Sequence, residues 1–170
     1  RTLSEEDFDT EKIFGEEGVS VFHISGLIAA MSESTTKCCI KLAETAKKYG
    51  TLVSFDLNYR ATFWKNREKE LSAAFSQIAS MADILIGNEE DFQLCLGFKG
   101  PEEGGRDLAS KIESFKSMIS AVKEKYSNAA MFATTLRQVL SANEHLWGAI
   151  LLADGKWYCE EPREIQVLDR

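Results

Sequence analysis

The sequence lacks the features that mark several large functional classes. No apolar run approaches the ~20 residues of a membrane-spanning helix, and the longest candidate, Gly148–Ala153, has the length of a buried strand. The chain has 20 Lys and Arg against 27 Asp and Glu, and this net charge of −7 disfavours general nucleic-acid binding, which requires excess positive charge. The segment Arg1–Gly15 is acidic and polar, unlike a secretory signal. We therefore expect a cytoplasmic protein that binds neither membranes nor nucleic acids.

Residues that commonly carry metal or redox chemistry are also scarce. The chain has 4 Cys and 2 His. No two cysteines have the C-x-x-C spacing of zinc and thioredoxin-like sites, and the adjacency of Cys38 and Cys39 disfavours a simple bridge between them. His23 lies in an apolar run and His145 in a polar stretch, without the acid and nucleophile of a catalytic triad. The expected state of the cysteines is that of small buried thiols in a reducing compartment.

Linker-like composition is missing too, since the chain has only 2 Pro and no low-complexity tract. The stretch Lys99–Gly105 is short enough to be a loop within one domain. What the sequence does contain is an alternation of short apolar runs with helical spacing of apolar residues. The apolar runs are Val19–Ile24, Leu52–Phe55, Ile84–Ile86 and Ala130–Ala133. This alternation predicts an α/β fold with three layers, in which an open, mostly parallel sheet has helices on both faces.

Turn residues predict a different arrangement near the end of the chain. The segments Trp147–Leu152 and Lys156–Cys159 flank an Asp-Gly turn, and this pattern is typical of a β-hairpin. Glu164–Leu168 is a candidate for one further strand. We therefore expect an antiparallel edge hairpin beside the parallel strands.

Capping residues predict where three helices begin. Ser32 or Ser34 is expected to cap the first long helix, and Asn66 the second. Asn88 precedes a short helix that runs from Glu89 to about Leu96.

Polar side chains follow three of the predicted strands, and in open α/β sheets ligands bind beyond the carboxyl ends of strands. The first group is Asp56-Leu57-Asn58-Tyr59-Arg60, directly after the run Leu52–Phe55. Asp56, Asn58 and Arg60 alternate, so in an extended chain they point the same way. Arg60 offers a planar fork of donors for a carboxylate or a phosphate. An Asp–Arg pair that only stabilises the loop explains the pattern equally well.

The second and third groups follow the next two strands. Asn88 and the acidic residues up to Asp91 suit a helix N-terminus, and this structural interpretation is favoured over a hydrated Mg²⁺ site beside phosphates, because capping requires nothing else. Thr135 and Arg137 follow the run Ala130–Ala133 and offer a hydroxyl and a guanidinium for phosphate oxygens. A threonine-rich strand end with a solvated arginine is the alternative.

Taken together, the three groups resemble a known family. The segments FDLNYRATFWKN (residues 55–66), DILIGNEEDF (83–92) and ATTLRQVLSA (133–142) resemble, in this order, the PfkB/ribokinase family of carbohydrate kinases, and most closely its 2-keto-3-deoxygluconate kinase branch. The resemblance covers essentially the whole chain. It implies a ribokinase-like fold and an ATP-dependent transfer of a phosphoryl group to a hydroxyl of a sugar or sugar acid. It also implies Mg²⁺ and a monovalent cation such as K⁺ as cofactors.

The resemblance also implies roles for individual residues. Arg60 would bind the substrate carboxylate or the transferring phosphate. The nucleotide and its phosphates would be bound by Asn58, Tyr59, Arg60, Thr135 and Arg137. Asn88 and Asp91 would organise Mg²⁺ through water, although the family prefers Glu where this chain has Asp91. Asp169 would lie near the monovalent cation, and Arg137 replaces a glycine that is common in ribokinases.

The same resemblance predicts that residues 1–170 form the central part of a ribokinase-like kinase domain. The lid and N-terminal part would precede Arg1, and the glycine-rich loop and catalytic base would follow Arg170. No catalytic residue is therefore assigned within the chain, which we expect to be inactive alone. The full-length enzyme would phosphorylate 2-keto-3-deoxygluconate and could form a homodimer. The alternatives are a kinase for a neutral sugar, such as fructose or ribose, and a catalytically incompetent remnant.

Overall fold

The computed structural model describes residues 3–100 and 108–167, with the side chains of 108–111 left aside. Its first half is built on parallel strands. These are β1 (Val21–Ser25), β2 (Leu52–Asp56), β3 (Ile84–Ile86) and the first part of β4 (Met131–Val139), which lie side by side in chain order. The three parallel pairings confirm the strand–helix alternation read from the sequence.

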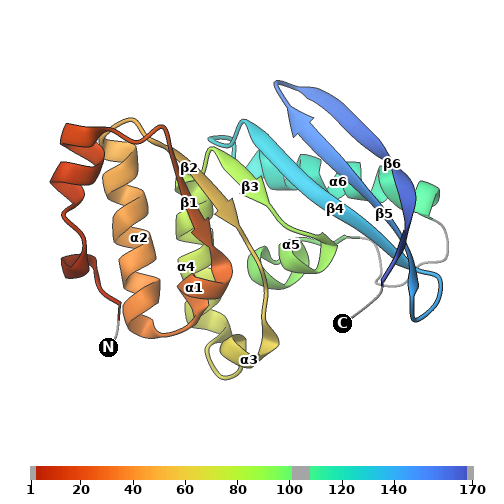
Figure 1. Cartoon of the computed structure of the whole chain (residues 1–170), viewed down its shortest axis with the longest axis horizontal. Coiled ribbons are helices and arrows are strands. Elements are labelled where there is room, and N and C mark those ends of the chain that lie inside the picture. The colour runs from red at the N-terminus through yellow and green to blue at the C-terminus, as the bar shows by residue number, and fades with distance from the viewer. Residues whose placement is uncertain (1–2, 101–107, 168–170) are drawn as a thin grey trace.

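The second half of the sheet is antiparallel. β5 (Glu144–Ala153) pairs with β4, and β6 (Lys156–Gln166) pairs with β5 to complete a six-stranded sheet (Figure 1). The turn between β5 and β6 contains Asp154 and Gly155 at φ of 51° and 73°, the left-handed conformation that Asp-Gly tolerates. The predicted edge hairpin is therefore confirmed. It is longer than expected, because the segment predicted as a further strand from Glu164 continues β6 as far as Gln166; Leu168 lies outside the described residues.

Three long helices connect the parallel strands, and they lie on one face of the sheet. They are α2 (Glu33–Lys48), α4 (Glu68–Met81) and α6 (Leu108–Lys125); α4 and α6 are drawn behind the strands in Figure 1, and α2 packs against α4. Short helices lie at the loops: α1 (Gly26–Ala30), α3 (Ala61–Trp64) and α5 (Glu89–Leu96). A 3₁₀ turn, η1 (Glu5–Asp7), and a π-helix, η2 (Glu11–Glu17), precede β1. In the described part of the chain, no helix is long and apolar enough to cross a membrane.

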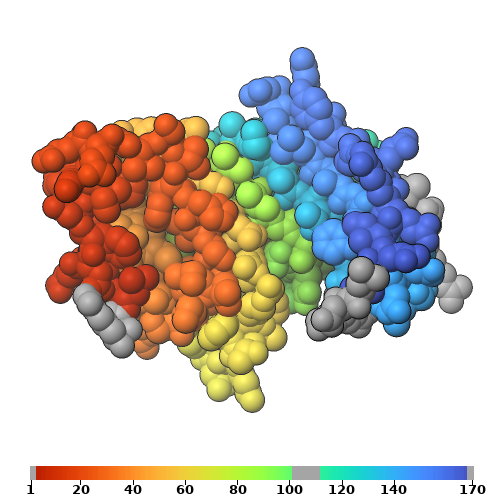
Figure 2. Space-filling view, viewed as in Figure 1, coloured from red at the N-terminus to blue at the C-terminus, as the bar shows by residue number. Residues whose placement is uncertain are grey.

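The distribution of the helices differs from the expected two covered faces. Parallel strands that follow one another in a single direction, joined by right-handed crossovers, place every connecting helix on the same side. Val53 and Phe55 of β2 are accordingly buried toward the helices, whereas Leu52, which points the other way, is 47% exposed. In Figure 2, segments from β1 to β6 reach the surface side by side on the uncovered face. Among the described residues, the sheet thus has one helical layer.

The predicted helix starts are partly confirmed. Ser32 caps α2 by accepting the backbone N–H of Thr35, and Asn88 caps α5. Asn66 does not cap α4. Its backbone takes a left-handed conformation at φ of 67°, its own N–H donates to Glu68, and the helix begins one residue later than a cap at that position would allow. A short helix that the sequence pattern did not reveal, α3, ends at Trp64, two residues before Asn66.

Buried thiols are confirmed for three of the four cysteines. Cys38, Cys39 and Cys95 are buried, and burial raises the pKa of Cys39 to about 12. A thiol with such a pKa stays protonated and unreactive at neutral pH. Cys159 is the exception, because it lies exposed on the edge strand β6.

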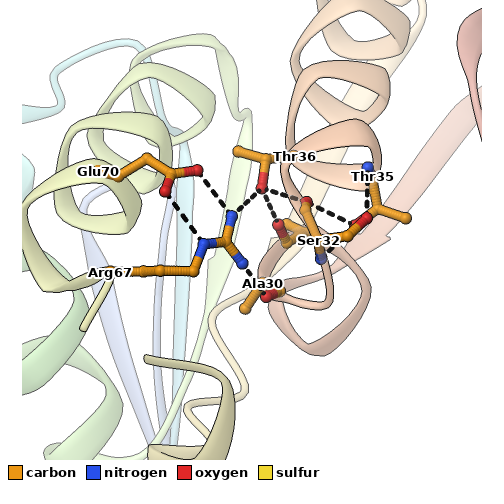
Figure 3. A network of polar contacts seen from close by, with 7 residues as sticks. Ala30, Ser32, Thr35, Thr36, Arg67 and Glu70 are labelled. Atoms are coloured by element: carbon orange, nitrogen blue, oxygen red, sulfur yellow. Dashed lines mark hydrogen bonds and ion pairs between the residues drawn. The ribbon is translucent and has the colours of Figure 1, made fainter. Parts of the chain in front are cut away.

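A polar network around Arg67 joins the starts of two long helices to the end of α1 (Figure 3). The Arg67 guanidinium donates to the carbonyl of Ala30 at 2.7 Å and to Thr36 Oγ1 at 3.2 Å, and it pairs with Glu70 at 2.6 Å. The buried Thr36 hydroxyl lies 2.6 Å from the carbonyl of Ala29, to which it donates. The network therefore fixes α1, which follows β1 directly, against the helical layer.

We expect Arg67→Ala to lower the free energy of unfolding by about 1–3 kcal/mol, because it leaves buried acceptors without donors. Urea denaturation measures this change. The matched control is Lys69→Ala, an exposed cation in the first turn of α4, the helix that Arg67 precedes; it should change stability by less than about 0.5 kcal/mol. Equal effects of the two substitutions would contradict a structural role for the network.

Candidate functional site

The candidate site is the edge where the parallel strands end together. The pairing places Ser25 of β1 beside Asp56 of β2, Asp56 beside Ile86 of β3, and Ile86 beside Ala133 of β4. The loops that follow β1, β2 and β3 therefore meet at one level. This is the position at which open α/β sheets bind ligands.

The loop after β2 is not the extended segment that the sequence pattern predicted. Asn58 has φ of 39°, so the alternation of Asp56, Asn58 and Arg60 is broken. Asn58 instead turns toward β1, and its Nδ2 donates to Ser25 Oγ at 3.0 Å. Arg60 is exposed, and its Nη1 donates to the neighbouring carbonyl of Tyr59 at 2.7 Å. The guanidinium is thus anchored on one side and open to solvent on the other.

Gly26 allows the loops after β1 and β2 to approach closely. A Cβ atom at this position would lie 1.9 Å from the carbonyl oxygen of Leu57, a distance that no side chain could accept. This close approach brings Ser25 within reach of Asn58. Sequence reasoning did not select Ser25 or Gly26, although a Ser-Gly pair directly after an apolar run was a usable signal.

Asp91 links the loop after β2 to the loop after β3. Its carboxylate is only 6% exposed, with Oδ1 accepting the backbone N–H of Tyr59 at 2.8 Å and Oδ2 accepting the backbone N–H of Asn88 at 2.8 Å. The Asn88 side chain in turn accepts the N–H of Asp91 at 2.9 Å, which completes a capping box at the start of α5. The helix-capping interpretation of Asn88 and Asp91 is therefore confirmed, with an additional contact to Tyr59 that the sequence did not reveal.

These contacts also test whether Asn88 and Asp91 fit a Mg²⁺ ion. Both carboxylate oxygens of Asp91 and the Asn88 Oδ1 already accept backbone N–H groups, and little of Asp91 reaches solvent. Across residues 3–100 and 108–167, no group of three or more His, Cys, Asp or Glu side chains is placed to hold a metal ion. The pair does not fit direct coordination of Mg²⁺. A role through bridging water stays a prediction.

Asp56 is a second carboxylate at the same edge, and it is half-buried. Burial raises the pKa of its carboxyl group above the usual value, and the nearby Asp91 carboxylate raises it further. His23, the backbone of Asn58 and Arg60 oppose this effect. The edge thus holds two neighbouring carboxylates. That of Asp91 accepts two backbone N–H groups, and burial raises the pKa of that of Asp56.

The third predicted group does not lie in a loop. Thr135 and Arg137 belong to β4, which continues past the end of β3 because β5 supplies its hydrogen-bonding partner. They pair with Ala149 and Trp147 of β5, and both are exposed on the uncovered face of the sheet. The Arg137 guanidinium lies 5.8 Å from the centre of the Trp147 ring. The two side chains therefore remain beyond the carboxyl edge of the parallel strands, as expected, but on a strand instead of a loop.

The structure thus brings some of the predicted residues into direct contact and leaves others apart. Asn58, Tyr59, Asn88 and Asp91 belong to two loops joined by hydrogen bonds. Arg60 directly follows Tyr59, whereas Thr135 and Arg137 lie apart from this cluster on β4, and all three side chains are exposed. Asp169 lies outside the described residues, so its expected place near a monovalent cation stays a prediction.

We expect Asp91→Asn to lower the free energy of unfolding by about 1.5–3 kcal/mol, because it removes the charge of a buried acceptor that binds two part-buried backbone N–H groups. Chemical denaturation monitored by circular dichroism measures the loss. Glu6→Gln, at an exposed carboxylate, serves as control. If Asp91→Asn lost no more stability than Glu6→Gln, the proposed role of Asp91 in joining the two loops would be contradicted.

The raised pKa of Asp56 predicts how stability changes with pH. The folded chain holds a proton on Asp56 more tightly than the unfolded chain does, so this group lowers stability as the pH rises from about 4 through its folded-state pKa. Asp56→Asn should remove this dependence and be more stable than the wild type at neutral pH. Urea denaturation between about pH 4 and 8 measures both effects, and Glu16→Gln serves as an exposed control. If Asp56→Asn were less stable than the wild type at about pH 7, burial of the charged Asp56 carboxylate would not destabilise the fold and the account would be contradicted.

The chain is similar in sequence to curated proteins. The curated 5-dehydro-2-deoxygluconokinase of Clostridium perfringens is 31% identical over 121 residues, which are 71% of this chain and 34% of that protein. The chain thus spans about a third of the length of the curated relatives it matches.

Solved structures extend the similarity to nearly the whole chain. The 2-dehydro-3-deoxygluconokinase of Thermotoga maritima superposes with a TM-score of 0.83 at 29% identity, covering 98% of this chain and 47% of that one. A putative 2-keto-3-deoxygluconate kinase from Enterococcus faecalis has a TM-score of 0.78 at 27% identity, with the same coverage of 98% and 47%. Residues 4–132 match the family described as pfkB family carbohydrate kinase. Because this match covers most of the chain and the fold agrees with it, the chain belongs to the pfkB family of carbohydrate kinases.

Proposed function

We propose that this chain is the central part of a ribokinase-like kinase domain, and that the domain transfers a phosphoryl group from ATP to a hydroxyl of a keto-deoxy sugar acid. The observation that supports this most directly is the pair of loops after β2 and β3. The loop after β2 carries Asn58 and the exposed Arg60 at the carboxyl edge, and the close approach at Gly26 and the hydrogen bonds of Asp91 fix its backbone relative to the loops after β1 and β3.

The substrate class follows from the relatives and from Arg60. The C. perfringens and T. maritima proteins are both named for keto-deoxy sugar acids, with the keto group at different carbons. Both acids carry a carboxylate, which a guanidinium binds with two parallel hydrogen bonds. One side of the Arg60 guanidinium is held by the Tyr59 carbonyl and the other is exposed, as a carboxylate ligand requires. We take 2-dehydro-3-deoxygluconate as the first candidate and 5-dehydro-2-deoxygluconate as the second.

The proposed mechanism depends on positioning and electrostatics, because phosphoryl transfer requires little covalent chemistry from the protein. Arg60 would orient the sugar acid or the transferring phosphate, whereas Asn58, Tyr59, Thr135 and Arg137 would bind the nucleotide and its phosphates. When bound, Mg²⁺ would neutralise phosphate charge, but Asn88 and Asp91 do not offer it direct ligands. No residue of the chain is assigned as the general base, and we propose that another part of the domain supplies it.

The main alternative is a kinase for a neutral sugar, because Arg60 could bind phosphate in either case. A coupled ADP-release assay on the full-length enzyme separates the two with a panel of both dehydro-deoxygluconates, fructose and ribose. We expect turnover with a sugar acid. Arg60→Gln should raise the KM for that acid by about tenfold, and Arg60→Lys should raise it less, because lysine keeps the charge but lacks the fork of donors. Turnover with the neutral sugars alone would contradict the sugar-acid proposal.

The 170-residue chain itself can be tested for nucleotide binding. Isothermal titration of ATP with Mg²⁺ should give a measurable dissociation constant, since most of the proposed phosphate-binding residues lie within the chain. Asn58→Ala should weaken binding, with Asn143→Ala in the β4–β5 turn as control. Absence of binding would favour a chain that folds as an inactive remnant.

A further inference from the structure

A stripe of two arginines and a tryptophan crosses the three strands at the antiparallel end of the sheet. Arg137 of β4 pairs with Trp147 of β5, and Trp147 pairs with Arg163 of β6, so the three residues are neighbours across the strands. Cross-strand partners project from the same face of a sheet. We call these three residues the Arg-Trp-Arg stripe.

The stripe is accessible on the face that carries no helical layer. Trp147 is 39% exposed, although large aromatic side chains usually find cover, and the Arg163 side chain is 79% exposed. The neighbouring Leu136 points the opposite way and is buried, whereas Thr135 and Arg137 are exposed. The stripe therefore continues the face on which the proposed phosphate-binding residue Thr135 lies.

The contacts within the stripe differ between its two arginines. The Arg137 guanidinium lies 5.8 Å from the centre of the Trp147 ring, within the range of a cation–π interaction, so the indole restricts where this cation points. Arg163 pairs with Glu160 on its own strand, but both side chains are largely exposed and such surface pairs contribute little. Arg163 can therefore exchange Glu160 for a ligand with more negative charge.

The stripe places two guanidinium groups on one face of a chain whose net charge is −7, and guanidinium groups that lie close together attract anions. Glu160, Glu161 and Glu164 lie on the same strand as Arg163, so an anion that binds there has to displace Glu160 from its ion pair. Neighbouring strands lie about 4.8 Å apart, so the stripe extends about 10 Å from β4 to β6. A single elongated polyanion can contact both arginines at once over this distance.

We propose that the Arg-Trp-Arg stripe binds the phosphate groups of the nucleotide, with Arg163 as a second phosphate-binding cation and Trp147 as a positioning residue that acts through Arg137. This inference rests on the proposed nucleotide-binding function and adds Trp147 and Arg163 to it. Neither residue was selected from the sequence, because their proximity to Arg137 depends on the pairing of β4, β5 and β6.

Isothermal titration of the 170-residue chain with ATP and Mg²⁺, and separately with inorganic tripolyphosphate, tests the proposal. Arg163→Gln should weaken the binding of both probes by about tenfold. Trp147→Ala should weaken it by about threefold, the value expected for an exposed cation–π contact, and Trp147→Phe should restore most of the loss. In an Arg137→Gln background, Trp147→Ala should have no further effect, which a merely structural role would not predict.

Two matched controls lie at the other end of the same hairpin. Tyr158→Ala removes an exposed aromatic ring and Lys156→Gln an exposed cation, both on β6 but away from the stripe, and neither should change the affinity. Thermal unfolding of each variant shows whether the fold is retained.

The outcomes separate this inference from the function on which it rests. If the wild-type chain binds neither probe, the proposed function fails and the stripe proposal with it. If the wild type binds ATP and the Trp147 and Arg163 variants bind equally well, only the stripe proposal fails. If those variants lose affinity for ATP but not for tripolyphosphate, the stripe contacts the nucleoside and the assignment to phosphate is wrong.

Discussion

The carboxylate of Asp91 is the constraint on which the rest of the candidate site depends. It is buried, and a buried carboxylate is costly unless hydrogen-bond donors satisfy it. The donors are two backbone N–H groups from different loops, those of Tyr59 and Asn88. Because each of these backbone groups lies between a strand and the helix that follows it, this one side chain fixes the relative position of the loops after β2 and β3.

The remaining contacts at this edge extend the same principle. Gly26 lets the start of α1 approach the Leu57 carbonyl, and the Arg67 network holds the end of α1 against α2 and α4. The loops are thus fixed through backbone atoms and buried polar groups. The side chains proposed to bind ligands, Arg60 and Arg137, are left exposed. Such a division allows a site to be rigid and still offer free donors to a substrate.

The sequence predicted the parts of the fold that local chemistry decides. Apolar runs marked the parallel strands, the Asp154-Gly155 turn marked the hairpin, and Asn88 marked a helix start. The sequence did not reveal contacts between segments that lie far apart along the chain. The hydrogen bond that the Tyr59 N–H donates to Asp91 and the pairing of Arg137 with Trp147 depend on strand register, and the single helical layer depends on strand order. Asn58 adopts a left-handed backbone conformation, so the prediction that Asp56, Asn58 and Arg60 point the same way was wrong.

Amide hydrogen exchange at Tyr59 and Asn88 tests the central claim most directly. Both residues lie outside the strands and helices, where backbone amides usually exchange quickly. If Asp91 holds the two loops together, both amides will be strongly protected in the wild type, and both will lose protection in Asp91→Asn while the amide of Val53 in β2 keeps its own. Fast exchange of Tyr59 and Asn88 in the wild-type chain would contradict the account.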